Sequence, residues 1–352
     1  NADFDGDEMH LHIPQTEEAM VEAESLMNAI KHIRSPRFSG AIIGAVRDQI
    51  TGLYLLTKDE TVLSRKEFVQ LIRAVNQDID IPEKESLKGK EIFSLFLPQD
   101  FSITCKSKSG EDVIIKNGKL IKGIIDANSI GAEEGRIIDA LEKEYGGKFT
   151  KQFLYNITRL SIEFITSMGF SVSISDQDLP PKVKNEIKNV IEKIRKETEK
   201  LKERYEKGEL RVLVGRTPEE SLEHAIKIVL RNGLNEVGKI LERSLEENST
   251  LAMAKSGSRG GLVNLVQTAA MVGQEMVMGE RMKKGYYQRN FPHFKRGEMG
   301  LEERGFVSRG FKDGLTPFEF FFDAINSRES LMDKSLKTRH SGYMERRLVG
   351  AL

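Results

Sequence analysis

Three carboxylates lie close together near the start of the chain, in the stretch DFDGD, at Asp3, Asp5 and Asp7. In an extended or tightly turned backbone, residues i, i+2 and i+4 point to the same side, so these carboxylates converge. At about 5 Å and an effective dielectric constant near 20, each pair repels by roughly 3 kcal/mol. A divalent cation removes this repulsion, and all-oxygen ligands select Mg²⁺, Mn²⁺ or Ca²⁺ over zinc. The stretch therefore predicts a divalent-metal site, and Gly6 lets the backbone turn within it.

Other interpretations of this region are weaker or remain open. An EF-hand loop has glycine at position 6 and glutamate at position 12, whereas counting from Asp3 puts Gly6 at position 4 and Pro14 at position 12. His10 and His12 have the spacing of two ligands on a strand, but no cysteine cluster or third nearby histidine accompanies them, so we interpret them as packing residues. A solvent-exposed acidic turn without a metal remains the alternative.

The charge is unevenly distributed along the 352 residues. The whole chain has 54 basic and 54 acidic residues, but residues 281–352 contain 15 Lys or Arg and 9 Asp or Glu, a net charge of +6. Residues 1–280 therefore carry 39 against 45, or −6. A basic segment of this kind indicates either a surface that faces a polyanion or an ordinary solvated surface.

Cysteine content and hydropathy restrict the cellular context. The single cysteine, Cys105, excludes an internal disulfide framework and favours a reducing, cytoplasmic environment. No apolar run is long enough to span a membrane, and no signal peptide is visible. Because the chain begins at Asn1, without Met and inside its most unusual motif, we expect it to be a piece of a longer protein.

Turn and capping signals define the elements of the first half. The stretch TEEAMVEAESLMNAI predicts a helix over residues 16–30 with an acidic first turn. Residues 85–145 are expected to be rich in β-structure, and Asn117-Gly118 between alternating flanks predicts a two-residue hairpin turn. A helix is predicted over residues 151–168, ending at Gly169.

A helical hairpin is predicted next. Apolar residues at helical spacing within a highly charged run predict an amphipathic helix from Pro181 to Gly208. A second helix begins at TPEE, where Thr217 is the N-cap and Glu220 completes a capping box. The segment GLNEVGK, residues 233–239, has P-loop spacing but lacks the Ser or Thr after its lysine, so we interpret it as part of this helix.

The chain ends in a long predicted helix. TPFE repeats the capping pattern at Thr316, and no proline interrupts residues 317–352 after Pro317, so one helix of roughly 50 Å is expected. Gly342 either permits close approach of another chain, provides a place to bend, or is a tolerated surface glycine.

The stretch AKSGSRGGLVNLVQTAAMVGQE, with Lys255 and Arg259, is either a phosphate-holding loop before a helix or a flexible cap.

Three stretches together resemble the largest subunit of multisubunit DNA-dependent RNA polymerase, of the archaeal A′ type. They are NADFDGDEM, GSRGGLVNLVQTAAMVGQE and GLTPFEFFFDAINSRESLMDKSLKTRHSGYMERRL, in one order over essentially the whole chain. The resemblance implies a mixed, irregular α+β chain of several domains. They are the end of the active-site region at 1–32, a pore domain at 33–174, a funnel domain with the helical hairpin at 175–313, and a bridge helix at 314–352.

The resemblance also implies roles for individual residues. Asp3, Asp5 and Asp7 match the family's ligands for the resident catalytic Mg²⁺, and a second Mg²⁺ arrives with the nucleoside triphosphate. Asn1 matches a position that contacts the incoming ribose. Thr338, Arg339 and Tyr343 match positions beside the template strand. The chain departs from the pattern we expect at His10, Arg339 and His340, which leaves the acidic triad untouched but puts the detailed template contacts in question.

The implied function is template-directed nucleotidyl transfer from nucleoside triphosphates to an RNA 3′-hydroxyl, in the assembled enzyme only. Expected partners are the second-largest and other polymerase subunits, the DNA template, the RNA–DNA hybrid, and a transcript-cleavage factor that enters through the funnel. Two alternatives stay open on the residues alone. One is another Mg²⁺-dependent phosphoryl- or glycosyl-transfer enzyme with an aspartate-rich loop, and the other is a non-catalytic interaction module.

Overall fold

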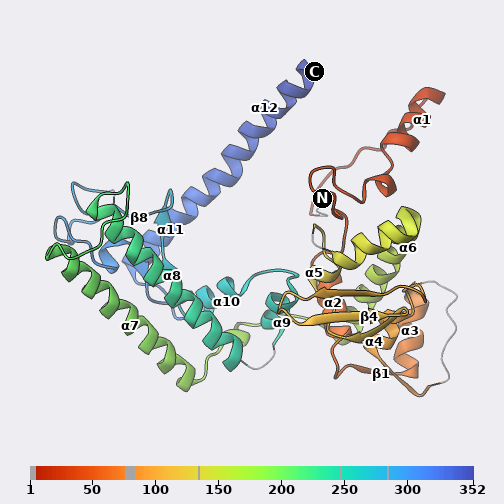
Figure 1. Ribbon diagram of the computed structural model, residues 1–352, viewed down its shortest axis with the longest axis horizontal. Helices are drawn as coiled ribbons and strands as arrows, with labels where there is room; N and C mark the ends of the chain where they lie inside the picture. The colour runs from red at the N-terminus through yellow and green to blue at the C-terminus, as the bar shows by residue number, and fades with distance from the viewer. Residues whose placement is uncertain (1–4, 76–83, 134, 246–247, 284) are drawn as a thin grey trace. The chain divides into compact units, whose positions relative to one another are not determined.

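The structure is a computed structural model of all 352 residues, and it describes residues 5–75, 84–133, 135–245, 248–283 and 285–352 (Figure 1). The chain forms two compact units, each with its own hydrophobic core. The first unit comprises residues 1–171 and 252–259, and the second comprises residues 172–251 and 260–352.

The first unit combines helices with small antiparallel sheets. Its elements are α1 (Glu17–Leu26), η1 (Ala29–His32), α2 (Asp48–Leu56), β1 (Val62–Ser64), α3 (Arg65–Val75), β2 (Ser86–Lys88), α4 (Gly89–Ser94), β3 (Ile103–Lys106), β4 (Asp112–Lys116), β5 (Lys119–Lys122), α5 (Ala127–Ile130) and α6 (Arg136–Met168). The predicted helix at 16–30 is confirmed over α1, with Thr16 as its N-cap, but it ends at Leu26 and a separate 3-10 turn, η1, follows.

The core of the first unit is built around α6. Its residues Phe153, Ile157, Leu160 and Phe164 recur at steps of four, three and four, so they form one buried stripe against which α2 and α3 pack. Ser161, on the same helix, donates its hydroxyl to two backbone carbonyls at the start of α2, at 3.0 and 2.8 Å. The close approach of α2 to α6 is therefore fixed by both apolar burial and hydrogen bonds.

The predicted helix over 151–168 is confirmed but is part of a longer one. Helix α6 begins at Arg136 and has a kink at Gly146, whose φ of 77° and ψ of 170° are not helical. It ends before Gly169, as predicted, where φ is 76°. Glycine adopts this conformation without the steric cost that other residues pay.

The predicted hairpin is confirmed in the sheet β3–β4–β5. Asn117 and Gly118 both have positive φ, 49° and 69°, as a type I′ turn requires. Outside this sheet the wider expectation of β-structure over 85–145 holds only for β2, because residues 89–94, 127–130 and 136 onward are helical. Asp126 explains part of the difference, since its carboxylate accepts a hydrogen bond from the backbone N–H of Ser129 and caps α5.

The second unit is mainly helical. Its elements are η2 (Ile174–Gln177), α7 (Pro181–Glu206), α8 (Pro218–Ser244), α10 (Leu262–Ala269), β6 (Gly273–Gln274), β7 (Met276–Val277), β8 (Glu280–Arg281), η3 (Glu302–Arg304), β9 (Phe306–Val307), α11 (Pro317–Met332), the π-helical turn η4 (Asp333–Lys337) and α12 (Thr338–Ala351). Helix α9 (Ser249–Ser256) crosses the boundary between the units. Strand β6 pairs with β9, and β7 pairs with β8.

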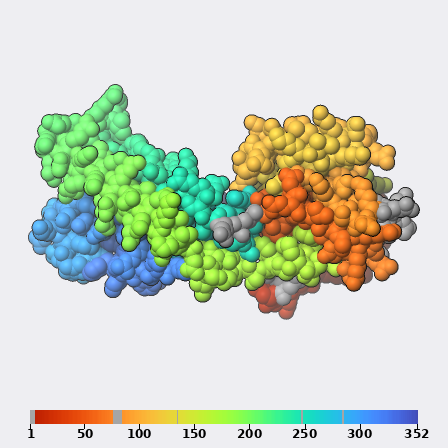
Figure 2. Space-filling view, turned by 90° about the horizontal axis from the view of Figure 1, so that it is seen from below, coloured from red at the N-terminus to blue at the C-terminus, as the bar shows by residue number. Residues whose placement is uncertain are grey.

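Helices α7 and α8 pack against each other and form the predicted hairpin. Their surfaces adjoin in the space-filling view (Figure 2). Thr217 and Glu220 form the capping box, with Pro218 in the first turn of α8. A Cβ at Gly233 would lie 2.3 Å from Cδ1 of Ile194, so glycine allows the close approach of the two helices. The segment with P-loop spacing lies inside α8, which confirms its interpretation as helix.

The last predicted helix is present but is not uniform. Thr316 and Glu319 form the capping box of α11. The α-helical pattern changes to a π-helical turn at η4 and returns in α12. Gly342 lies within α12, and no described atom lies within 4 Å of a Cβ built there. Of the three alternatives for Gly342, this chain by itself shows no close approach there, and the departure from α-helical geometry lies at η4.

The expected fold class, a mixed α+β chain with small sheets and long helices, is confirmed. Within the part of the chain that the structure describes, no helix has the length and apolar character needed to cross a lipid bilayer. Cys105 is buried in the first unit as a free thiol.

Candidate functional site

The predicted metal site is only partly within the described residues. Asn1 and Asp3 lie outside them. Asp5 and Gly6 form a turn, and Asp5 and Asp7 are both exposed. Gly6 has a φ of 140°, and open space surrounds the position of a Cβ, so the turn rather than crowding requires glycine here.

The donor chemistry of this turn fits a hard cation. Asp5 and Asp7 supply carboxylate oxygens on either side of Gly6, and no buried apolar wall separates them from solvent. Among the residues that the structure describes, no group of three or more His, Cys, Asp or Glu side chains is arranged to hold a metal ion. His10 and His12 are also exposed, so their interpretation as packing residues is wrong.

The predicted template-facing residues all belong to α12. Thr338 is the first residue of this helix, and Arg339 and Tyr343 are four residues apart on one of its faces. All three are exposed. The guanidinium carbon of Arg347 lies 5.5 Å from the centre of the Tyr343 ring. Arg347 therefore adds a second positive charge, after Arg339, to the helix face that carries Tyr343.

The exposed surface of α12 is rich in arginine. Arg339, Arg346 and Arg347 are accompanied within the helix by one acidic residue, Glu345. An ion pair of 2.7 Å joins Lys337 to Asp333 within η4, one turn before this face. Arginine therefore outnumbers acid on α12, and its one acid, Glu345, lies directly before Arg346 in the sequence.

The first turn of α11 anchors this long helix to the body of the second unit. One carboxylate oxygen of Glu319 accepts the backbone N–H of Ser308 at 2.9 Å, and the other accepts the backbone N–H of Thr316 at 2.9 Å. Burial opposes ionisation of Glu319, but these hydrogen bonds and those from the two hydroxyl groups outweigh it and lower its pKa. The helix therefore starts from a rigid, charged cap.

Aromatic packing completes the anchor. Phe322 is 2% exposed, and its ring centre lies 5.1 Å from that of Phe291 in an edge-to-face arrangement. Phe318 and Phe321 contact the same Phe291 ring from the adjacent turns of α11. The base of the helix is held by this cluster, while α12 is exposed along its length.

The predicted site residues are divided between the two units. Asp5 and Asp7 belong to the first unit, whereas Thr338, Arg339 and Tyr343 belong to the second. The structure places Thr338, Arg339 and Tyr343 on one helix, whereas Asp5 lies in a turn and Asp7 in the extended segment that follows it. Sequence reasoning missed the contact of Glu319 with Ser308, because the partner lies 11 residues earlier and no local pattern marks it.

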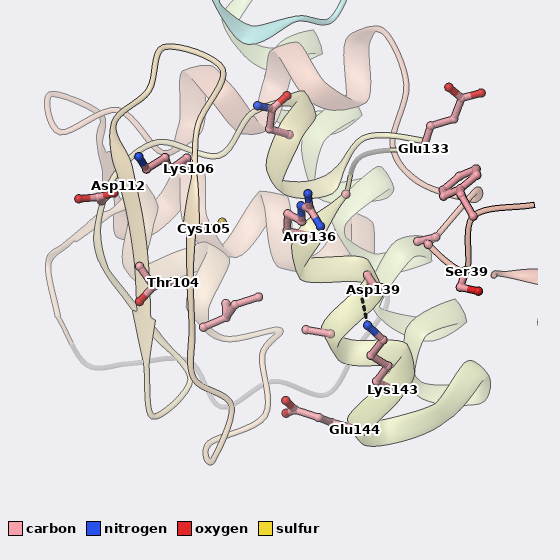
Figure 3. A pocket seen from close by; sticks show the side chains of 17 residues that line it. Ser39, Thr104, Cys105, Lys106, Asp112, Glu133, Arg136, Asp139, Lys143 and Glu144 are labelled. Atoms are coloured by element: carbon pink, nitrogen blue, oxygen red, sulfur yellow. Dashed lines mark hydrogen bonds and ion pairs between the residues drawn. The ribbon is translucent and has the colours of Figure 1, made fainter. Parts of the chain in front are cut away.

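A cavity of about 1040 Å³ in the first unit contains none of the predicted site residues (Figure 3). Its lining has charges of both signs, and Lys143 points toward Asp139 across a distance of 2.8 Å. The side chains of Lys106 and Arg136 also line it. With positive and negative groups interleaved, the cavity does not select one kind of ligand.

Family models place the chain among RNA polymerase subunits. Four models that describe consecutive parts of one protein match in chain order: RNA polymerase Rpb1 domain 2 at residues 1–29, domain 3 at 32–177, domain 4 at 201–307 and domain 5 at 314–352. The matches run from the DFDGD turn to the end of α12.

Curated relatives agree along the whole chain. The DNA-directed RNA polymerase subunit Rpo1N of Methanothermobacter thermautotrophicus is 42% identical over 368 residues, covering 100% of this chain and 42% of the relative. The subunits of the same name from Thermococcus celer and Methanocaldococcus jannaschii are 40% and 42% identical, again over 100% of this chain, and are covered to 43% and 28%.

The chain thus spans less than half the length of these curated relatives. The family-model matches follow one another in chain order, and about two residues in five are identical to the relatives. The similarity extends along the whole chain and is not confined to one motif. On these grounds the chain belongs to the family of the largest subunits of DNA-directed RNA polymerases.

Proposed function

We propose that this chain contributes part of the catalytic centre of a DNA-directed RNA polymerase, and that it acts only within the assembled enzyme. The reaction is transfer of a nucleotidyl group from a nucleoside triphosphate to the 3′-hydroxyl of RNA, directed by a DNA template. The observation that carries the proposal is the acidic turn at Asp5 and Asp7, at the beginning of a chain that matches polymerase subunits along its full length.

Asp3, Asp5 and Asp7 would hold one resident Mg²⁺, and a second would come with the nucleoside triphosphate. When bound, Mg²⁺ lowers the pKa of the attacking hydroxyl and neutralises charge on the leaving pyrophosphate. The aspartates concentrate negative charge at one turn without offering a strong nucleophile of their own. Asn1 would contact the ribose of the incoming nucleotide.

The exposed face of α12 would lie beside the template strand. Arg339 supplies a charged, planar donor group for phosphate oxygens, and the ring of Tyr343 offers a flat surface for a base. Thr338 adds a hydroxyl group at the start of the same helix. Because phosphate contacts position a strand without reading its sequence, this face suits a template that must move past it.

We also propose that successive segments of the chain form different parts of the enzyme. Residues 1–32 end the active-site region, residues 33–174 form the pore, residues 175–313 form the funnel, and residues 314–352 form the bridge helix. The division of the structure after residue 171 and the family-model match that begins at residue 314 support two of these boundaries.

The proposed partners follow from this division. The exposed apolar residues before and within α1, such as Met9, Leu11 and Ile13, would be covered by the second-largest subunit or another polymerase subunit. The DNA template and the RNA–DNA hybrid would contact α12. The hairpin α7–α8 would form part of the funnel through which nucleoside triphosphates and a transcript-cleavage factor enter.

The test is substitution of Asp5 in the assembled enzyme. Asp5→Ala should abolish both RNA synthesis and Mg²⁺-dependent transcript cleavage while leaving subunit assembly intact. Glu111→Ala, at an exposed acid in the turn between β3 and β4, is the matched control and should leave both activities unchanged. Retained synthesis by Asp5→Ala would favour a non-catalytic interaction module, and turnover by the isolated chain would favour a different Mg²⁺-dependent enzyme.

A further inference from the structure

The basic surplus near the end of the chain is concentrated in one short segment. Residues 281–297 contain six Lys or Arg and no Asp or Glu, whereas residues 298–352 contain nine of each. The net charge of +6 over residues 281–352 therefore lies entirely in residues 281–297, which we call the basic segment. Two tyrosines, two phenylalanines and a histidine are interleaved with its six cations.

The basic segment presents its two tyrosines on a tight turn. The backbone N–H of Tyr286 donates to the carbonyl of Arg289 at 2.8 Å, and the N–H of Arg289 donates to the carbonyl of Tyr286 at 3.4 Å. Tyr286 and Tyr287 are 58% and 73% exposed. Both side chains are therefore available to a partner outside the chain.

Hydrogen bonds fix the base of this turn. The guanidinium group of Arg289 donates to the carbonyls of Pro292 and Phe294, at 2.6 and 3.3 Å. The side-chain amide of the buried Asn290 donates to the carbonyl of Met282 at 3.0 Å. Because these contacts tie both ends of the turn to the flanking chain, little backbone freedom remains to be lost when a ligand binds.

An arginine lies beside the exposed ring of Tyr287. The backbone N–H of Gly297 donates to the carbonyl of Gln288 at 2.9 Å, which brings the end of the basic segment back to the turn. The guanidinium carbon of Arg296 lies 6.0 Å from the centre of the Tyr287 ring. A flat aromatic surface and a positive charge are therefore next to each other.

The cations of the basic segment differ in their availability. Arg281 is in a buried ion pair, and Lys283 forms an ion pair of 3.5 Å with an acid of β8. Lys295 and Arg296 are exposed instead, and no carboxylate in the described part of the chain forms an ion pair with either. These two cations are therefore the ones that can neutralise the charge of an incoming anion.

The nearest cavity does not include this surface. It has a volume of about 270 Å³ and is lined by Glu219, Glu298 and Glu303 together with four cations. Tyr287 and Arg296 do not line it. The ring and the guanidinium group therefore form a surface outside this cavity of mixed charge.

We propose that the turn at residues 286–289, with Lys295 and Arg296 beside it, is a binding site for single-stranded nucleic acid that is separate from α12. An unpaired base stacks on the ring of Tyr287, and the two cations contact the adjoining phosphates. Stacking accepts every base, because each has a flat π face, so the site has little sequence preference. An acidic peptide could use the cations but has no group that needs the exposed rings.

The test uses the complete 352-residue chain in EDTA. Fluorescence anisotropy measures its affinity for labelled single strands of RNA and of DNA, about 12 nucleotides long, which is within the range that such sites cover. The DNA duplex of the same sequence is measured beside them. Equal affinity for both single strands identifies stacking and phosphate contacts as sufficient, and tighter binding of RNA identifies its 2′-hydroxyl group as a further contact.

Variants separate stacking from charge. Tyr287→Ala should weaken binding of single strands roughly tenfold and leave binding of the duplex unchanged, because only an unpaired base can stack on the ring. Tyr287→Phe keeps the ring and should bind as the wild type does. Arg296→Ala should reduce the magnitude of the slope of log affinity against log salt concentration by about 0.7, the value for one phosphate of a single strand. Tyr155→Ala, at an exposed tyrosine of α6, is the matched control and should have no effect.

Photocrosslinking locates the site independently of any substitution at the turn. A single strand that carries 5-iodouracil is irradiated with the chain, and the attached peptide is identified by mass spectrometry. Crosslinks should fall on Tyr286 or Tyr287 in the wild type, and they should persist in Arg339→Ala. Crosslinks confined to α12 would overturn the proposal.

The proposal is also wrong if Tyr287→Ala binds single strands as tightly as the wild type, or if it weakens duplex and single strand equally. Displacement of the strand by polyglutamate as readily as by an unlabelled strand of equal charge would identify a surface for acidic proteins instead. Circular dichroism checks that each variant is folded. Because these assays contain no Mg²⁺ and no RNA synthesis, their failure is distinct from failure of the proposed catalytic role.

Discussion

The guanidinium group of Arg281 lies 3.4 Å from both carboxylate oxygens of Glu223, and the two side chains are 0% and 3% exposed. The pair joins β8 to α8 inside the second unit, and Arg281 also donates to the carbonyl of Gly300 at 2.6 Å. Burial lowers the pKa of Arg281, and the opposing charge of Glu223 resists this change. Each charge is therefore tolerable only because the other is present.

Removal of one member of this pair should be strongly destabilising. Arg281→Met leaves Glu223 as an uncompensated buried charge, and we expect a loss of about 3–5 kcal/mol in the free energy of unfolding, measured with chemical denaturant. The double variant Glu223→Leu, Arg281→Met should regain much of this loss, because neither charge remains. Lys193→Met, which breaks an exposed pair with Glu236, is the control and should have little effect. Equal losses in the single and double variants would contradict this account.

The cap of α11 should make stability depend on pH in the acid range. The pKa of Glu319 is lowered in the folded chain, so its contribution to stability is present above the ordinary pKa near 4.5 and is lost as the pH falls below it. Glu319→Gln should therefore flatten the fall of melting temperature between about pH 5 and pH 3. Glu242→Gln, at an exposed acid of α8, should leave that slope unchanged.

The same cap has a component that does not titrate. Thr316→Ala removes the hydroxyl that accepts the backbone N–H of Glu319 at 3.3 Å. We expect a cost of about 1 kcal/mol in unfolding free energy at neutral pH. Thr316→Ser keeps the hydroxyl group and should recover most of this loss. If serine and alanine were equally destabilising, the methyl group rather than the hydrogen bond would be responsible.

The two turns of the sheet β3–β4–β5 allow a matched comparison of two glycines, Gly110 between β3 and β4 and Gly118 between β4 and β5. Gly118 has a φ of 69°, and a Cβ there would lie 2.5 Å from the carbonyl oxygen of Pro98, whereas Gly110 has a φ of 88° with open space around it. Gly110→Ala should cost about 1 kcal/mol from backbone strain alone. Gly118→Ala should cost at least about 2 kcal/mol more, because it adds a steric clash. Thermal unfolding of both variants measures the difference, and similar values would show that the strand end moves to relieve the clash.

The basic face of α12 should be visible in the salt dependence of template binding. In the assembled enzyme, Arg339→Ala should weaken binding of DNA template and reduce the magnitude of the slope of log affinity against log salt concentration by roughly 1, as for loss of one phosphate contact. Arg211→Ala, in the connection between α7 and α8, is the control for a general change of charge. An unchanged slope would mean that Arg339 does not contact a phosphate.

Local sequence signals predicted those parts of the fold that local chemistry determines. The capping residues at Thr217 and Thr316 placed the starts of α8 and α11, and Asn117-Gly118 placed the hairpin turn. Each signal works because the side chain or backbone conformation satisfies hydrogen bonds within four residues. The family resemblance, carried by the two terminal motifs and the central stretch, is supported by the matched relatives.

Features that depend on distant partners were not predictable in this way. Glu275 is buried, but no local pattern around it in the sequence marks it as a buried acid. Arg281 and Glu223 are 58 residues apart, and nothing in either neighbourhood marks them as a pair. The expectation of β-structure over 85–145 failed because α4 and the start of α6 are stabilised by their contacts with the sheet and with α2. Propensity was overridden there by tertiary packing.

The π-helical turn η4 changes the direction in which the side chains of α12 point relative to those of α11. An α-helix advances about 100° per residue, and a turn with i→i+5 hydrogen bonds accommodates one residue more than this count allows. A helical-wheel projection from Phe322 through Tyr343 that turns 100° at every residue ignores this extra residue. It therefore places the side chains after Lys337 about 100° away from their true direction around the helix axis. Any graft, cross-link or shortened version that spans Asp333–Lys337 has to treat α11 and α12 as two helices with separate phases.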